Sequence, residues 1–204
     1  MDFDGSMDVQ KGYQTDSVLQ ERLGFQTIHL VEFLMEAAMI GDPFAVIHLA
    51  LCYVNGDGAS RDKQKAIELF QQAADMGDTD AMFNLGVCYD NGDGASRDKQ
   101  KAIELYQKAY DMGDTDAMFN LGACYSKGDG ASRDKQKAIE LYQKAYDMGD
   151  TDAMFNLGVC YDNGDGVSRD KQKVIELFQR AANLGNTLAM AQLNKQDQEM
   201  TKHN

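Results

Sequence analysis

The residues best suited to chemistry lie in the glycine-rich loop YDNGDGASRDKQ at 89–100, copies of which recur along the chain. Its N-G-D-G core combines oxygen ligands with glycine turns, as calcium-binding loops do. With Asn91 and Asp93 aligned as ligands, an EF-hand would need an acid at position 89 and a bidentate glutamate at position 100. Tyr89 and Gln100 stand there instead. We therefore expect no metal site, because glycine, asparagine and aspartate form tight turns without one.

A second reactive set consists of four cysteines that recur every 36 residues, at Cys52, Cys88, Cys124 and Cys160. Equivalent helices of neighbouring repeats pack about 10 Å apart, whereas a disulfide needs Cα atoms within about 7 Å of each other. We expect free thiols that pack as small hydrophobic side chains, in a reducing compartment.

Nothing else in the sequence forms a recognisable catalytic or zinc-binding set. The histidines His29, His48 and His203 do not lie beside a repeated cysteine at metal-ligand spacing. No Ser-His-acid or Cys-His pattern can be placed, and abundant carboxylates are typical of solvated helix faces and caps. The chain is predicted to be a non-enzymatic protein without a metal or cofactor.

The charge balance restricts the possible partners. Lysine and arginine number 20 against 33 aspartate and glutamate, a formal net charge of −13, so the positive surface that binds nucleic acid is missing. The apolar runs are too short to cross a membrane, and the acidic opening MDFDGSMDVQ does not form a secretory signal. We expect a cytoplasmic monomer that binds neither nucleic acid nor membrane.

The loops and cysteines recur because the chain is built from a repeated unit. The segment Asp78–Gly113 returns at Asp114–Gly149 with three changes, Val87 to Ala123, Asp90 to Ser126 and Asn91 to Lys127. More divergent copies occupy 42–77 and 150–185. A fixed period of this length is typical of stacked helical repeats, since one unit cannot bury its apolar face alone.

Each repeat is predicted to fold as a helix, a glycine-rich loop and a second helix. In the repeat 78–113, Asp78 is placed to cap the first helix and Asp98 the second. Gly92 and Gly113 are placed to end them.

Partial units are expected at both ends of the array. Residues 30–41 align with a second helix and form an orphan half-repeat, preceded by an N-terminal extension over 1–29. Residues 186–204 are expected to form a C-terminal capping helix and tail, because their apolar residues thin out as an outer face requires.

The helical period separates a core arc from an open arc. In the first helix, Ala81, Leu85, Cys88 and Tyr89 share one side at i, i+4, i+7 and i+8 spacing. Gly86 is small where the paired helices are expected to approach closely, so a bulky residue there would overpack the unit.

A single pattern holds in phase through all four repeats. In the repeat 78–113 it comprises Ala81, Leu85, Gly86, Tyr89, Gly92, Gly94, Asp98, Ala102, Ala109 and Gly113. This pattern closely resembles the Sel-one-like repeat, a longer-looped relative of the tetratricopeptide repeat. The resemblance implies an all-α, right-handed superhelical α-solenoid of helix-loop-helix repeats. It also implies first helices that line a concave face, and a role as an adaptor or scaffold without catalysis.

The open arc of the first helices is the side that such solenoids turn towards their ligands. Stacking at the 36-residue period aligns its asparagines, phenylalanines and aspartates into rows. The predicted groove residues are Asp80, Phe83, Asn84, Val87, Asp90, Asn91, Asp116, Phe119, Asn120, Lys127, Asp152, Phe155, Asn156, Asp162 and Asn163. Asparagine can bond a ligand's backbone, phenylalanine supplies apolar area and aspartate attracts basic residues. We expect a protein or peptide partner with basic and apolar residues.

Two questions stay open at the level of sequence. The first repeat carries apolar residues on this arc, at Phe44, Ile47, Leu51 and Val54, which either are covered by residues 1–29 or form a docking patch for a partner. The near identity of two repeats also allows a structural spacer, or an engineered consensus scaffold without a natural ligand.

Overall fold

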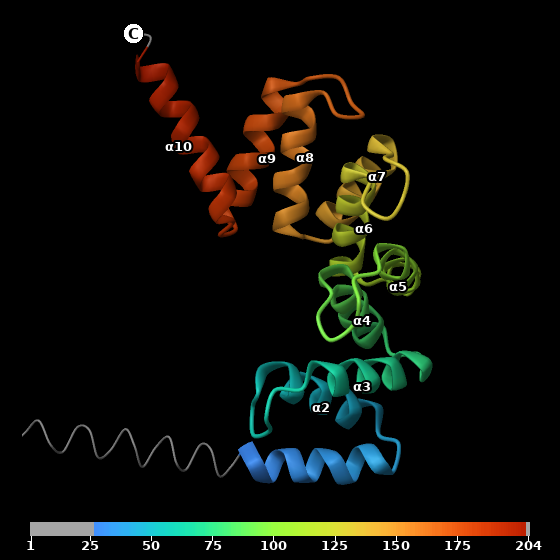
Figure 1. The fold of residues 1–204 in the computed structure, drawn as a ribbon. Helices are drawn as coiled ribbons and strands as arrows, with labels where there is room; N and C mark the ends of the chain where they lie inside the picture. Colours follow the sequence, from blue (N-terminus) through green and yellow to red (C-terminus); the bar gives the residue numbers. More distant parts are fainter. Residues whose placement is uncertain (1–26, 203–204) are drawn as a thin grey trace, which may run out of the picture. The chain divides into compact units, whose positions relative to one another are not determined.

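The computed structural model describes residues 27–202, and every regular element in that range is an α-helix (Figure 1). The predicted all-α repeat fold is confirmed. The helices are 27–39, Pro43–Asn55 (α2), Lys63–Asp75 (α3), Thr79–Asn91 (α4), Lys99–Asp111 (α5), Thr115–Lys127 (α6), Lys135–Asp147 (α7), Thr151–Asn163 (α8), Lys171–Asn183 (α9) and Thr187–Lys202 (α10). The chain is already helical at residue 27, within the segment assigned to the N-terminal extension. The rest of that extension, 1–26, lies outside the described residues.

The chain divides into two compact units. Among the described residues, one unit comprises 27–81 together with Asp93–Ala95, and the other comprises Met82–Gly92 and 96–202. In the first unit α2 packs against α3. In the second unit packing runs in succession from α5 through α6, α7, α8 and α9 to α10. Each of these helices thus contacts the next one along the chain, as stacked repeats require.

Local sequence sets the ends of the helices. Asp78 Oδ1 accepts the Ala81 N–H at 2.8 Å, and Asp98 Oδ1 accepts the Lys101 N–H at 3.0 Å. Each bond satisfies an amide that has no partner inside its own helix. Gly113 follows α5 with a φ of +95°, a conformation that glycine adopts without steric cost.

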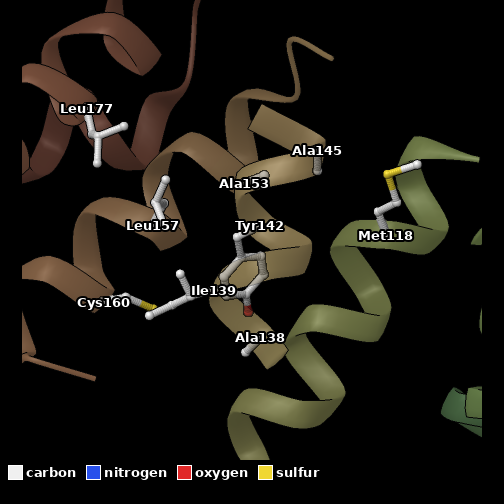
Figure 2. Packing of buried hydrophobic residues seen from close by; sticks show 9 residues of the cluster. All are labelled: Met118, Ala138, Ile139, Tyr142, Ala145, Ala153, Leu157, Cys160 and Leu177. Atoms are coloured by element: carbon white, nitrogen blue, oxygen red, sulfur yellow. The ribbon is translucent and has the colours of Figure 1, made fainter. Parts of the chain in front are cut away.

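The core of the second unit is shared between consecutive helices. One cluster combines Met118 on α6, Tyr142 on α7, Leu157 on α8 and Leu177 on α9 (Figure 2). Leu157 and Leu177 are fully buried. No single repeat contains this cluster, so burial of apolar surface depends on the stacking of repeats.

The four cysteines are free thiols. Cys52, Cys124 and Cys160 are buried and Cys88 is half-buried. Burial is the largest cause that raises the pKa of Cys124 and of Cys160 to about 11. At neutral pH these side chains therefore pack as neutral thiols and are poor nucleophiles.

Candidate protein-interaction face

The phenylalanines of the first helices divide their surface between core and solvent. Phe83, Phe119 and Phe155 are half-buried. The ring centroids of Phe119 and Tyr142 lie 6.0 Å apart, and those of Phe155 and Phe178 lie 5.3 Å apart. Such aromatic pairs stabilise the fold beyond the area that they bury. Part of each ring thus packs within the protein, and part is exposed to solvent.

The asparagine row follows the phenylalanines by one residue. Asn84, Asn120 and Asn156 are half-buried, so they lie neither in the core nor in open solvent. A carboxamide both donates and accepts hydrogen bonds, which suits it to the backbone of an extended segment. Val87 is also half-buried and packs against the cluster that contains Tyr106.

Aspartates occupy the first turns of the same helices. Asp80, Asp116 and Asp152 are exposed. Asp152 Oδ1 accepts a hydrogen bond from Asn186 Nδ2 at 2.6 Å, while Asn186 Oδ1 accepts the Ala189 N–H at 2.9 Å and caps α10. Negative charge is favourable at these helix N-termini because of the helix dipole. At the end of the array, a buried asparagine thus fixes the position of the last aspartate.

Carboxylates of successive repeats lie close enough to affect one another. Asp150 caps α8 by accepting the Ala153 N–H at 2.7 Å. Burial is the largest cause that raises the pKa of Asp150, and backbone hydrogen bonds oppose the rise. The carboxylates of Asp152 and Asp116 raise the pKa of Asp150 further. Because Asp116 belongs to the preceding repeat, the negative potential extends from one repeat to the next.

Asp90, one of the predicted groove residues, has a charged partner within the protein. Its side chain is 24% exposed and forms an ion pair with Lys99 at the start of α5. Lys99 Nζ also lies 3.5 Å from Asp129 Oδ2. The charge of Asp90 is balanced inside the protein, because the loop returns the chain so that α5 starts beside the end of α4. The other residues predicted near the ends of the first helices are exposed, namely Asn91, Lys127, Asp162 and Asn163.

The glycine-rich loops connect neighbouring repeats, a role that the loop sequence by itself does not reveal. Lys135, at the start of α7, forms an ion pair with Asp165 in the loop of the next repeat. Gly166 follows with a φ of +74°, and a Cβ atom there would lie 2.8 Å from the Lys135 carbonyl oxygen. In the first unit Lys63 and Asp93 form the equivalent ion pair at 2.6 Å. The signal in the sequence is a lysine and an aspartate that share the 36-residue period.

Arginines complete the same loops. Arg133 Nε donates to the Ser126 carbonyl oxygen at 3.0 Å, and Arg97 Nε donates to the Asp90 carbonyl oxygen at 2.9 Å. These oxygens belong to the last turns of first helices, where carbonyls lack helical partners. Within 27–202, no group of three or more histidine, cysteine, aspartate or glutamate side chains could hold a metal ion. In these loops the arginines thus have a structural role at the ends of the first helices.

The apolar residues of the first repeat differ in exposure. Phe44 is 66% exposed, and its ring centroid lies 3.9 Å from that of the His48 ring. Leu51 and Val54 are half-buried. Ile47 is buried, in contrast to the expected exposed patch, because it packs into the core of the first unit. Residues 1–29 are the possible cover for this patch, and 1–26 of them lie outside the described part of the chain.

Comparisons with known proteins give one consistent result. The family model of the Sel1 repeat matches residues 43–78, 79–114, 115–150 and 151–186. A protective antigen of uropathogenic Escherichia coli with an SLR fold is 33% identical, with a TM-score of 0.73 over 78% of this chain and 34% of the antigen chain. A Sel1 repeat protein from Oxalobacter formigenes is 32% identical, with a TM-score of 0.76 over 80% of this chain and 67% of its own.

More distant structures share the fold. The immunity protein Pa5087 of Pseudomonas aeruginosa is 24% identical, with a TM-score of 0.54 over 78% of this chain and 59% of that protein. A search of curated proteins gives no match. No helix among the described residues is long and apolar enough to span a membrane.

Proposed function

The chain belongs to the Sel1 repeat family, and on that premise we propose that it is a non-catalytic scaffold that binds a protein segment on its first helices. Sel1 repeat proteins generally mediate protein interactions. The partner is a segment with basic and apolar residues, and the protein works in the cytoplasm.

One observation carries this proposal. On α6 and α8 the same face presents a half-buried phenylalanine, a half-buried asparagine and an exposed aspartate. Ring contacts with Tyr142 and Phe178 account for part of the Phe119 and Phe155 surface, and the half-buried Asn120 and Asn156 follow them along the same helices. Apolar area, backbone-bonding amides and negative charge on one face suit an extended basic segment.

The division of roles follows from the chemistry. The phenylalanines provide the apolar contact that supplies most of the affinity. The aspartates accelerate association and make it dependent on ionic strength. The asparagines select the backbone direction of the bound segment through paired donors and acceptors.

A charge-reversal experiment tests the proposed face. Asp80, Asp116 and Asp152 are changed together to lysine, and proteins captured from a cell lysate are identified and quantified against the unchanged chain. We expect loss of the captured partners with this variant. A matched variant in which the exposed residues Glu104, Glu140 and Glu176 of the second helices become lysine should retain them. Equal effects of the two variants would contradict the proposed face.

The alternative is a spacer or a consensus scaffold without a natural ligand. It is favoured by the near identity of the segments 78–113 and 114–149, which differ at three positions. In that case the unchanged chain and both variants capture the same background proteins.

A further inference from the structure

A second surface lies where each second helix turns into the next first helix. In the second unit these turns have the same sequence, DMGDTD, at 111–116 and at 147–152, and we call them the turn edge. Each turn places an exposed methionine among three aspartates. The side chain of Met112 is 53% exposed, and that of Met148 is 57% exposed.

The core does not account for these methionines. Methionines that serve the fold are buried in the same unit, with Met118 at 7% exposure and Met154 at 1%. Met112 and Met148 instead follow the last residues of α5 and α7, where their backbone amides close the helix. A polar side chain would satisfy that backbone role with less apolar surface in water.

The charges of the turn edge are held in place by neutral donors. Asp147 Oδ1 accepts from Gln143 Nε2 at 2.9 Å, and Asp111 Oδ1 accepts from Gln107 Nε2 at 2.9 Å. A carboxamide orients a carboxylate without neutralising it. Lys108 and Lys144 lie in the last turns of α5 and α7, and Lys144 Nζ donates to the Tyr110 hydroxyl at 2.5 Å. The sequence from 111 to 118 and from 147 to 154 contains no further lysine or arginine.

The glycine-rich loops, at the other ends of the helices, differ from the turn edge in their charge. There Lys135 pairs with Asp165, and Arg169 Nε donates to the Asn163 carbonyl oxygen at 3.2 Å. In this loop, basic side chains thus pair with the Asp165 carboxylate and with the Asn163 carbonyl oxygen. The turn edge combines several carboxylates with exposed methionine side chains.

We propose that the turn edge is a second docking surface, occupied by a basic, amphipathic segment of a protein partner whose aliphatic side chains contact Met112 and Met148. The flexible thioether of methionine adapts to aliphatic side chains of different shapes. The surrounding aspartates select lysine or arginine at the flanking positions of the segment. This inference rests on the proposed function, because it extends the contact of the same partner from the first-helix face around Asp116 and Asp152.

The experiment uses the full chain and two designed peptides of equal charge. One is an amphipathic helix of lysine and leucine, and in the other every leucine is serine. Methionine methyl groups labelled with carbon-13 are observed by NMR during titration. We expect the signals of Met112 and Met148 to shift with the lysine–leucine peptide, while those of buried Met118 and Met154 stay unchanged.

Variants then measure the apolar contribution. Fluorescence anisotropy should show that the leucine peptide binds about tenfold more tightly than the serine peptide, as expected for burial of aliphatic groups. The triple variant M76Q/M112Q/M148Q should abolish this difference, because Met76 is 42% exposed in the identical turn sequence at 75–80. L184Q is the matched control, because Leu184 is 58% exposed at the same repeat position but has Asn183 and Asn186 in place of aspartates. It should preserve the difference.

The inference is wrong if neither peptide binds, if binding leaves the Met112 and Met148 signals unmoved, or if M76Q/M112Q/M148Q keeps the preference for leucine. Those results leave the proposed face on the first helices intact. The proposed function fails separately, when lysine at positions 80, 116 and 152 leaves partner capture unchanged.

Discussion

Gly122 on α6 lies directly against the ring of Tyr142 on α7. A Cβ atom at Gly122 would be 2.9 Å from Tyr142 Cε1, and the same contact recurs between Gly158 and Phe178 at 2.6 Å. Glycine inside a helix costs about 0.5–1 kcal/mol relative to alanine. Glycine is nevertheless required at this position, because the ring of the paired helix occupies the space that a side chain would fill.

We expect the substitution Gly122→Ala to destabilise the protein by about 1–2 kcal/mol, since overpacking outweighs the gain in helix propensity. Unfolding in urea, followed by circular dichroism, measures this change. In a Tyr142→Leu background the same substitution should cost less or become neutral. An equal cost in both backgrounds would show that the ring is not the obstacle.

The close approach at Gly86 was predictable from the sequence, but its partner was not. A small residue in an apolar arc indicates close packing of the paired helices, but it does not identify the side chain that fills the space. The structure places the ring of Tyr106 there, with a Cβ atom at Gly86 only 2.7 Å from Tyr106 Cε1. Which side chain fills a gap depends on the relative rotation of two helices, which a periodic pattern does not define.

The candidate site shows the same limit. Asp116 and Asp152 lie in the first turns of α6 and α8, a position that the repeat period predicts because period and caps are local properties. The repeat period did not predict that Asp90 would be balanced by Lys99, because that pairing depends on the path of the loop between them. The repeat period also did not predict that Ile47 is buried while Phe44 is exposed, because burial depends on the positions of the neighbouring helices.

Substitution of the loop glycine Gly166 should lower the free energy of unfolding more than loss of the ion pair beside it. Gly166→Ala combines a left-handed φ of +74° with a Cβ atom 2.8 Å from the Lys135 carbonyl oxygen. We expect it to cost about 2 kcal/mol. Asp165→Asn removes the pair with Lys135, whose side chain is 36% exposed, and should cost about 0.5 kcal/mol.

Gly149→Ala separates backbone strain from the contact, because Gly149 has a φ of +96° and nothing within 4 Å of the added Cβ atom. Urea midpoints of the three variants give the order of effects. A Gly149→Ala variant as unstable as Gly166→Ala would mean that strain alone explains the loop glycine.

The buried thiols should make the folded protein less stable at high pH. The pKa of Cys124 and of Cys160 rises to about 11 from 9.0, so the unfolded chain releases their protons first. Their contribution to stability is therefore complete below about pH 9 and is lost as the pH rises towards 11. Burial raises the pKa of Tyr106 and Tyr142 as well, which acts in the same direction.

Urea midpoints from pH 8 to pH 11 measure this loss, and the variant C124A/C160A should show a shallower decline. In the folded protein at pH 8 the two thiols should also react slowly with a thiol reagent, and faster in urea. An unchanged pH profile in the variant would exclude the cysteines as its cause.

Replacement of Asp150 by asparagine should raise stability, because the equivalent position of the last repeat already carries an asparagine. At the equivalent position of the last repeat, Asn186 caps α10 and also donates to Asp152 at 2.6 Å. Asp150 caps α8 equally well, but it can only repel Asp116 and Asp152, which is part of the reason that its pKa is raised. We expect Asp150→Asn to stabilise the protein by about 0.5 kcal/mol at low salt, because asparagine is as good a cap and removes the repulsion.

The stability gained by Asp150→Asn should depend on pH, because the pKa of Asp150 is raised. Its ionisation disfavours folding, so the advantage of Asp150→Asn is full at neutral pH and shrinks as the pH falls through that raised pKa. Added salt should shrink it too. Asp98→Asn tests the exchange of capping residue alone, since Asp98 caps α5 through the Lys101 N–H at 3.0 Å. If Asp150→Asn gains no more than Asp98→Asn at neutral pH, repulsion between the repeats does not limit stability, and the negative potential at this end of the first helices is weaker than the structure indicates.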